Sequence, residues 1–413
     1  MKIKNREITK KLLLIFGGAF AVLFFVWLFL FMSDPSGSQR AVFHTDGNDW
    51  FMDWFNVVYY SIGRKPYVWG LTEERSLPPL TFLLLYPFSK LYDYDVTGWV
   101  EGETRYTARY AQFPMVAALA VFVFSYLLLF YSLYKSSRVG SDLKKAFLFL
   151  ILFLSGVNLY CLDRGNLQVI TAASVFLYVY LCDRDDDMGK TGIVIGCFCL
   201  AFAAALKLFP AIMGIILLYR RKWKEAFLTF VMGAALFIFP FFWMDLSFTG
   251  AVGAFFRTLG EHASSYMTTA EFGFSTPVIT SLTGMSHGAL QIMAYLTAVI
   301  SLCTAWTLSG WKKLMLLMLT LVLTSGQQGY YCLMFLFLPI VLFFDEEHGW
   351  ADVIYVFLFA VILSPLQRTA HIGAVEIPAR AVINVFMLGL YIWLMAEAVR
   401  NAASVRSRGS VTE

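Results

Sequence analysis

Residues 12–32 read LLLIFGGAFAVLFFVWLFLFM, an uninterrupted apolar run. A helix needs about 20 such residues to cross a bilayer, because it rises about 1.5 Å per residue and the hydrocarbon core is about 30 Å thick. Basic residues precede the run, at Lys2, Lys4, Arg6, Lys10 and Lys11. The run is longer than the core of a signal peptide, and no small-residue cleavage site follows it. We therefore expect it to persist as a first spanning helix that leads outward from a cytoplasmic N-terminus.

The apolar character extends over the whole chain. Its 413 residues are 59% hydrophobic and only 15% charged, and they include 40 Phe, 21 Tyr and 11 Trp. This balance differs from that of a soluble globular protein, so the composition predicts a multi-pass membrane protein in contact with membrane lipids. The formal net charge is +4, and no basic tract with interleaved aromatic residues is present, which argues against a nucleic-acid partner.

Further apolar segments bring the expected number of spanning helices to about twelve. They lie at about 110–134, 146–161, 167–182, 191–206, 208–219, 225–244, 288–309, 314–325, 330–344, 350–364 and 380–399. Another apolar piece, at 77–92, has about 15 residues, too few for a bilayer that takes about 20. We expect this piece to be half-embedded or re-entrant, within a long first loop at 33–108.

The distribution of Lys and Arg supports this topology, because these residues accumulate in cytoplasmic loops. With twelve spans both termini are cytoplasmic, and most of the 32 basic residues fall in cytoplasmic segments, including 135–145 and 220–224. Treating 77–92 as a full span would place those two clusters outside. We therefore predict one integral-membrane domain over 1–413 in the plasma (inner) membrane, with a flexible cytoplasmic tail at 404–413.

The sequence shows no pattern of a metal site. The six cysteines lie mostly within apolar runs, and Cys197-Phe198-Cys199 has neither zinc-ligand spacing nor a nearby histidine. The five histidines form no i, i+4 pair. We expect the cysteines to be small buried apolar side chains, and we expect neither a metal nor a cofactor.

Three carboxylates among aromatic residues follow the first span, in Thr45-Asp46-Gly47-Asn48-Asp49-Trp50-Phe51-Met52-Asp53-Trp54. From Asp49 onward the pattern suits a helix, which would put Asp49 and Asp53 one turn apart on one face. Two like charges so close are unfavourable unless a cation or a shared proton relieves them. The segment is either a place for chemistry on a lipid-linked polar substrate or an interfacial helix with its Trp and Phe in the headgroups and its Asp in water.

Other polar residues that a scaffold does not require fall on the same outer face. They are Arg164, Asn166, Gln168, Lys207, Gln327, Gln328, Tyr330 and His371. Ionisable groups near membrane depth are costly and usually line a cavity or act on a ligand. We take these eight as candidate substrate-binding residues. The candidate catalytic residues are Asp46, Asp49 and Asp53.

Lys207 is the candidate that is hardest to explain as part of the scaffold. It stands in Ala203-Ala204-Ala205-Leu206-Lys207-Leu208-Phe209-Pro210, with almost no polar neighbour in sequence. Its ammonium could bind a lipid phosphate, or the side chain could extend to the headgroups. Arg164 could hold a phosphate through two hydrogen bonds, or it could pair with Asp163.

The amide and histidine candidates also leave alternatives open. Asn166 and Gln168 offer hydrogen bonds that would suit sugar hydroxyls. His371 could be a general acid or base, or a solvated loop residue.

Several motifs follow one another along the chain, namely an outer-loop Asp, Pro78-Pro79-Leu80, Arg164-Gly165-Asn166, Ala203-x-x-x-Lys207-x-x-Pro210 and Arg220-Arg221-x-Trp223. In this order they resemble the GT-C membrane glycosyltransferases, and among them glycosyltransferase family 87, a group that uses polyprenyl-phosphate mannose. The resemblance covers about residues 45–225 and is weaker in the hydrophobic remainder. The resemblance implies an all-α, polytopic fold of the GT-C type, with amphipathic helices in the long first loop.

The resemblance also implies roles for individual residues. The family's first-loop Asp is the catalytic base and stands about 17 residues before a Pro, as Asp49 stands before Pro66. Asp49 therefore takes the role of base, with Asp53 and Asp46 in reserve, and Lys207 matches the lysine that meets the donor phosphate. Family members often carry a His-His motif where this chain has 324–331, TSGQQGYY, a departure that bears on the donor and its sugar.

Together these observations predict a metal-independent, inverting hexosyltransferase. It would transfer mannose from a polyprenyl-phosphate donor to a lipid or glycan acceptor on the extracytoplasmic face. One carboxylate would deprotonate the acceptor hydroxyl while cations offset the charge on the departing phosphate. The alternatives are a flippase or transporter of lipid-linked saccharides, and a polymerase or ligase of such saccharides. Broken spans in matching halves would favour transport, and we see no such symmetry in the sequence.

Overall fold

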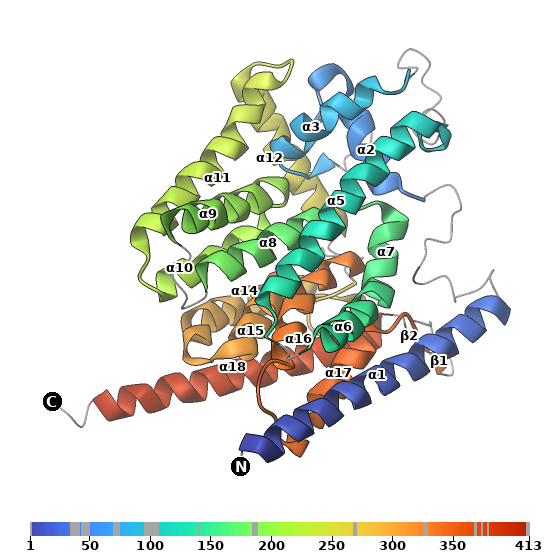
Figure 1. Cartoon of the computed structure of the whole chain (residues 1–413). Helices are drawn as coiled ribbons and strands as arrows, with labels where there is room; N and C mark the ends of the chain where they lie inside the picture. Colours follow the sequence, from blue (N-terminus) through green and yellow to red (C-terminus); the bar gives the residue numbers. More distant parts are fainter. Residues whose placement is uncertain are drawn as a thin grey trace. The chain divides into compact units, whose positions relative to one another are not determined.

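A computed structural model shows how the helices are arranged (Figure 1). The structure describes residues 2–33, 42, 50–68, 75–94, 107–138, 141–183, 189–266, 271–324, 329–366, 370–372, 375–377 and 380–409. Four candidate residues fall outside this part of the chain, namely Asp46, Asp49, Gln327 and Gln328. His371 is described by its backbone alone.

The regular secondary structure of the described residues is helical except for one two-stranded hairpin. Its strands are β1 (Ala370–Ile372) and β2 (Val375–Ile377). They pair antiparallel, with His371 opposite Glu376. The predicted helical fold is therefore confirmed apart from this hairpin, which lies in the last predicted outer loop.

The chain divides into two compact units, each built from separate stretches. Unit 1 comprises Met1–Thr45, Leu133–Tyr160 and Met267–Glu413, and unit 2 comprises Asp46–Ser132 and Cys161–Tyr266. Two of the boundaries fall inside the helices α5 (Gln112–Ser136) and α7 (Gly156–Arg164). The chain therefore passes between the units several times, and the expectation of one domain over 1–413 stays a prediction.

Unit 2 contains the predicted first-loop helices and a group of long helices. Its further elements are α2 (Met52–Ser61), η3 (Ile62–Arg64), α3 (Pro79–Leu85), η5 (Tyr86–Lys90), η6 (Ala108–Tyr110), α8 (Gln168–Cys182), α9 (Gly189–Leu206), η7 (Phe209–Gly214), α10 (Ile215–Tyr219), α11 (Trp223–Trp243) and α12 (Phe248–Tyr266). Helix α9 packs against both α8 and α11 (Figure 1). Helix α3 begins at Pro79, where the missing N–H of proline costs nothing.

Unit 1 is organised around a helix that is buried over most of its length. Its further elements are α1 (Lys2–Ser33), α6 (Asp142–Leu154), α13 (Pro277–Thr283), α14 (His287–Thr304), η8 (Ala305–Thr307), α15 (Gly310–Thr324), η9 (Tyr330–Leu336), α16 (Phe337–Phe343), η10 (Trp350–Asp352), α17 (Val353–Leu363), the hairpin and α18 (Ala381–Gly409). Helix α15 is buried continuously from Leu314 to Thr324 and packs against α14, α16 and α18. A helix that is apolar all round is stable only inside a protein or a membrane.

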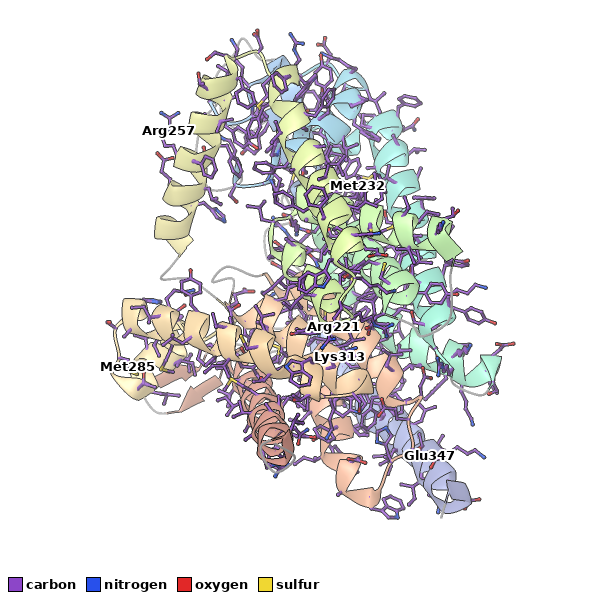
Figure 2. The ribbon with its side chains drawn as sticks, turned by 90° about the vertical axis from the view of Figure 1, so that its left-hand side faces the viewer. Arg221, Met232, Arg257, Met285, Lys313 and Glu347 are labelled. Carbon is purple, nitrogen blue, oxygen red and sulfur yellow. The ribbon has the colours of Figure 1, made fainter. Side chains whose placement is uncertain are left out.

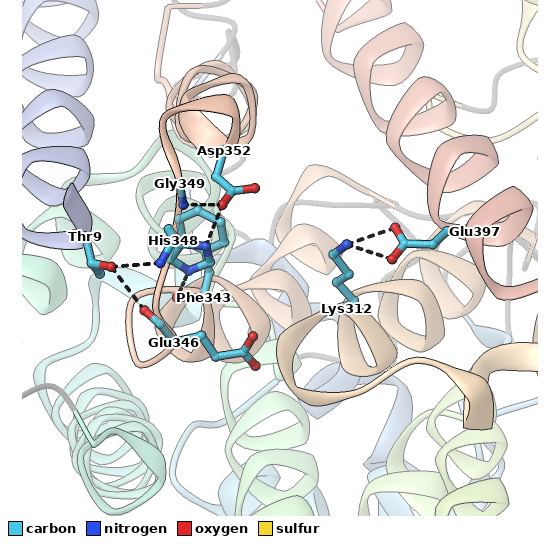
Figure 3. A network of polar contacts seen from close by, with 8 residues as sticks. All are labelled: Thr9, Lys312, Phe343, Glu346, His348, Gly349, Asp352 and Glu397. Atoms are coloured by element: carbon cyan, nitrogen blue, oxygen red, sulfur yellow. Dashed lines mark hydrogen bonds and ion pairs between the residues drawn. The ribbon is translucent and has the colours of Figure 1, made fainter. Parts of the chain in front are cut away.

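Polar contacts tie the first helix to the rest of unit 1 (Figure 3). The Thr9 hydroxyl donates to the carbonyl of Glu346 at 3.2 Å and accepts the backbone N–H of His348 at 3.1 Å. The His348 ring stacks on Phe343 at 3.8 Å, with Nδ1 3.1 Å from Asp352 Oδ2. These contacts anchor α1 to the turn that follows α16.

The expected count of about twelve spanning helices is not confirmed. Each predicted segment corresponds to helical residues. Within the part of the chain that the structure describes, however, six helices are long and apolar enough to cross a membrane, namely α1, α5, α9, α11, α14 and α18. A seventh span results if α6 and α7, which meet at a 55° bend, count as one. Other predicted spans are apolar helices of only 10–17 residues, short of the roughly 20 that a bilayer takes.

Two more differences from the prediction concern helix bounds. Helix α12 lies between the predicted spans at 225–244 and 288–309, where no helix was predicted. Its buried residues Ala251, Ala254, Phe255 and Thr258 follow helical spacing. Arg257, also on α12, is exposed and points outward (Figure 2). Helix α18 continues to Gly409, so it includes the first part of the predicted tail at 404–413.

Candidate active site

Helix α2 begins at Met52, three residues later than the sequence pattern suggested. Phe51 precedes it with a left-handed backbone, at φ 62° and ψ 17°. Its N–H donates to the carbonyl of Asp163 at 2.6 Å, and its ring packs 4.9 Å from that of Phe122. These tertiary contacts hold a non-helical backbone at Phe51, directly before the helix. Asp49 lies outside the described residues, so the expected i, i+4 arrangement of Asp49 and Asp53 stays a prediction.

Helix α2 lies inside unit 2. Trp54 and Phe55 are each only 1% exposed, whereas Trp50, before the helix, is 44% exposed. An interfacial helix would instead present these aromatic side chains to the headgroups. The burial of Trp54 and Phe55 therefore disagrees with the interfacial alternative.

The carboxylate of Asp53 is held from two sides. Arg164 donates to Oδ1 through Nε at 2.9 Å and also through Nη2, while Asn166 Nδ2 donates to Oδ2. The side chains of Asp53 and Arg164 are 18% and 13% exposed. Hydrogen bonds between charged partners are stronger than neutral ones, and partial burial reduces screening by water. The sequence had suggested Asp163 or a phosphate as the partner of Arg164, and Asp53 was not considered.

Asn166 connects this ion pair to Lys207. Its Oδ1 accepts from Lys207 Nζ and from the backbone N–H of Gln168, both at 2.9 Å. Lys207 also donates to Gln168 Oε1 at 3.1 Å. Lys207 is 9% exposed, which differs from the extended side chain that snorkelling requires. We call these five residues, with their two cations and one carboxylate, the Asp53 network.

The turn between α7 and α8 gives the network its shape. Gly165 has φ +59°, and a Cβ there would lie 2.7 Å from the ring of Phe51. Glycine is therefore required both by the backbone conformation and by the approach of Phe51. On either side of it, Arg164 ends α7 and Asn166 binds the first N–H of α8, which explains why Arg-Gly-Asn stands at this position.

The end of α9 positions Lys207. The hydroxyl of Thr81, on α3, donates to the carbonyl of Leu206 at 3.0 Å and satisfies a terminal carbonyl of α9. Leu80 packs with Ala205 and Leu206 in a buried cluster. The Pro-Pro-Leu segment of the first loop thus supports the helix end that carries Lys207.

Tyr330 belongs to unit 1, where it forms an aromatic cluster. The Arg380 guanidinium lies 4.5 Å from the ring centre of Tyr160 and 5.0 Å from that of Tyr330, and it pairs with Glu271. Tyr331 stacks on Tyr160 at 5.8 Å. Burial lowers the pKa of Arg380, but Glu271 and Tyr160 act in the opposite sense, so its pKa is raised overall and the guanidinium remains charged.

The described residues contain no group of three His, Cys, Asp or Glu side chains placed to hold a metal ion. Four cysteines are buried, Cys199 is half-buried and Cys303 is exposed.

Phe51, Gly165 and Arg109 contribute to this region and were missed as candidates. Arg109 is 2% exposed and donates to the carbonyl of Trp50 at 3.2 Å. Nothing in the sequence distinguishes it from the other basic residues of the first loop. Gly165 could have been identified as a candidate, because it lies between the candidates Arg164 and Asn166 in the Arg-Gly-Asn motif.

The apolar helices and the charged network together define a membrane protein with a polar, cation-rich site. A family model for glycosyltransferase family 87 matches residues 77–365, more than half of the chain. The chain belongs to this family and is a membrane glycosyltransferase, as the resemblance implied. No curated protein and no solved structure matches the chain. The matched range includes four residues of the Asp53 network and begins after Asp53 itself.

Proposed function

We propose that the chain transfers mannose from a polyprenyl-phosphate donor to a lipid or glycan acceptor, with inversion at the sugar. The Asp53 network is the observation that carries this proposal. It holds Arg164 and Lys207 in one connected set with Asp53. Asp53 is the last carboxylate of the acidic segment, residues 45–54. A donor phosphate would suit these two cations, and the amides of Asn166 and Gln168 would suit sugar hydroxyls.

The reaction needs one base and cations that stabilise the leaving group. The acceptor oxygen bonds to the anomeric carbon as the bond from that carbon to the phosphate oxygen breaks. Asp49 takes the hydroxyl proton. Arg164 and Lys207 offset the charge left on the polyprenyl phosphate. The scheme contains no metal step, and holding donor and acceptor in line supplies much of the rate.

Asp53 has a different role in this proposal. Its two oxygens already accept from Arg164 and Asn166, which leaves fewer lone pairs for a substrate proton. Asp53 therefore positions Arg164 and Asn166, and Asp49 remains the base. Asp46 is the reserve candidate.

The proposed site faces the outside of the plasma membrane, and both termini face the cytoplasm. The distribution of Lys and Arg between loops supports this orientation. Residues 33–108, which contain the acidic segment, are then extracytoplasmic.

The test is transfer from labelled polyprenyl-phosphate mannose by the purified protein, with a lipid extract as acceptor. Asp49→Asn should lower turnover by roughly 100-fold or more while donor binding survives. Asp245→Asn is the matched control, because that carboxylate is 59% exposed and pairs with Lys65 at 3.2 Å. Polyprenyl-phosphate glucose in place of the mannose donor tests the sugar.

Two results would change the proposal. If Asp49→Asn transfers normally and Asp53→Asn or Asp46→Asn does not, a different carboxylate is the base. If all three variants transfer normally, the acidic segment is not the active site.

A further inference from the structure

One peptide group beside the acidic segment is held at both of its polar atoms. It joins Trp50 to Phe51. Its oxygen accepts from Arg109 Nη1 at 3.2 Å, and its N–H donates to the carbonyl of Asp163 at 2.6 Å. Arg109 belongs to the first stretch of unit 2 and Asp163 to the second, so the structure holds this peptide by tertiary contacts.

That peptide fixes the backbone at the start of α2. Phe51 has φ 62°, a left-handed conformation that a bulky side chain rarely adopts. Two fixed hydrogen bonds select it, because rotating the peptide would break both. In the sequence, Asp49 stands two residues before Phe51, and Asp53 stands two residues after it.

Arg109 is suited to this task. It is 2% exposed, and its Nη2 donates to the hydroxyl of Tyr110 at 2.8 Å while Nη1 holds Trp50. A planar guanidinium can make these bonds in fixed directions, whereas a lysine has one mobile ammonium. Burying an arginine costs desolvation free energy. Arg109 is nevertheless buried, and it donates to the carbonyl of Trp50, the residue that follows the candidate base Asp49 in sequence.

We propose that Arg109 is a positioning residue that fixes the acidic segment and thereby aims Asp49 at the acceptor hydroxyl. This inference rests on the proposed function for its catalytic consequence. The two hydrogen bonds to the Trp50–Phe51 peptide, which we call the clamp, do not depend on the reaction. Arg109 acts through Asp49, and its loss misplaces the base without removing it.

Two measurements on Arg109→Lys test the proposal. The first is amide hydrogen exchange of peptides covering 45–55 in the purified protein without substrate, where exchange at Phe51 should accelerate. The second is transfer kinetics, where kcat should fall by about 10- to 100-fold with donor KM unchanged, as expected for a misplaced catalytic group. In the Asp49→Asn background, Arg109→Lys should cause no further loss.

Arg75→Lys is the matched control. Arg75 is also 2% exposed and lies in unit 2, where its guanidinium stacks 5.1 Å from the ring centre of Tyr60. Its replacement should leave exchange at Phe51 unchanged. If Arg109→Lys does not fold, Tyr110→Phe removes one support of the guanidinium, and the same two measurements apply to it.

The outcomes separate this inference from the proposed function. Unchanged exchange at Phe51 overturns the positioning role, whatever the activity. Faster exchange with unchanged kcat, or with equal losses in the wild-type and Asp49→Asn backgrounds, overturns the link to Asp49. Faster exchange in a protein that transfers no sugar from the polyprenyl-phosphate donor leaves the clamp in place and contradicts the proposed function alone.

Discussion

Asp53 and Arg164 form an ion pair between α2 and the last residue of α7, although 111 positions separate them in sequence. Asp53 belongs to the acidic segment, and Arg164 begins the Arg-Gly-Asn motif. The pair therefore joins the two regions that the sequence had marked independently. Asn166 extends the connection to Lys207. We therefore expect a change at one end of the network to affect groups at the other.

Asp53→Asn should destabilise the protein, because Arg164 loses its carboxylate at a site that is mostly buried. We expect a loss of about 1–3 kcal/mol, below the range for a fully buried pair, since both side chains keep some exposure. Thermal unfolding in detergent measures it. In a double-mutant cycle with Arg164→Gln, the two losses should be non-additive by at least about 0.5 kcal/mol. Additive losses would mean that the ion pair contributes nothing of its own.

Lys207→Met should weaken donor binding. The ammonium is fixed by Asn166 and Gln168, and replacing it removes a charge-assisted contact to the donor phosphate. We expect the apparent donor KM to rise by about 10-fold or more, the equivalent of one hydrogen bond to a charged group. Lys65→Met is the control, because Lys65 is 38% exposed and pairs with Asp245. An unchanged donor KM in a folded Lys207→Met protein would restrict Lys207 to a structural role.

Gly165→Ala should destabilise the turn between α7 and α8. The new Cβ would lie 2.7 Å from the Phe51 ring, in addition to the strain of φ +59°. Left-handed backbone costs about 1–2 kcal/mol, and an extra methyl group in a packed site costs about 1–3 kcal/mol. Gly189→Ala separates the two terms, because Gly189 has φ +66° and nothing within 4 Å of its Cβ position. Equal melting temperatures for the two variants would show that the Phe51 contact is unimportant.

The topology can be tested by labelling an introduced cysteine. Val139→Cys, in a chain that carries Cys303→Ser to remove the exposed native thiol, should react with a membrane-impermeant reagent only after the cells are opened. The reason is the basic cluster at 135–145, which the charge rule assigns to the cytoplasm. Labelling in intact cells would contradict the predicted orientation of this loop and would indicate that 77–92 crosses the membrane.

The positions of the helices could be predicted from the sequence, but their lengths and packing could not. Apolar runs mark α1 and α5 directly, because burial in a bilayer or a core requires them. Helix α12 was missed because its glycines, Gly250, Gly253 and Gly260, each lower helix propensity by about 1 kcal/mol. The packing of Ala251, Ala254 and Phe255 outweighs that cost, and no local rule reveals such packing in advance.

For the candidate site, too, the sequence indicated most of the residues but not the contacts between them. Arg164, Asn166, Gln168 and Lys207 were all candidates because each is a polar residue in an apolar setting, and the structure joins them. Their pairing with Asp53 could not be predicted, because no spacing rule connects residues so far apart. The left-handed Phe51 could not be predicted either, since a phenylalanine gives no sign of positive φ. Its causes are two hydrogen bonds to the Trp50–Phe51 peptide, which involve Asp163 and Arg109.

Asn166→Leu should affect both stability and donor binding, because one amide serves three partners in the Asp53 network. Its Nδ2 donates to Asp53, and its Oδ1 accepts from Lys207 and from the Gln168 N–H. Leucine has a similar size and can satisfy none of them, so each buried partner that is left unsatisfied costs about 1–3 kcal/mol. We expect a lower melting temperature and a raised donor KM.

The control for this substitution is Asn158→Leu. Asn158 is fully buried in unit 1 and donates to the carbonyl of Phe153 at 2.8 Å, outside the Asp53 network. Its replacement should lower the melting temperature without changing donor KM. Both variants lose a buried amide, but only Asn166→Leu loses a hydrogen bond to Lys207. If Asn158→Leu raises donor KM as much as Asn166→Leu does, the effect follows general destabilisation. If Asn166→Leu melts lower and keeps the wild-type donor KM, the network supports the fold and does not bind the donor.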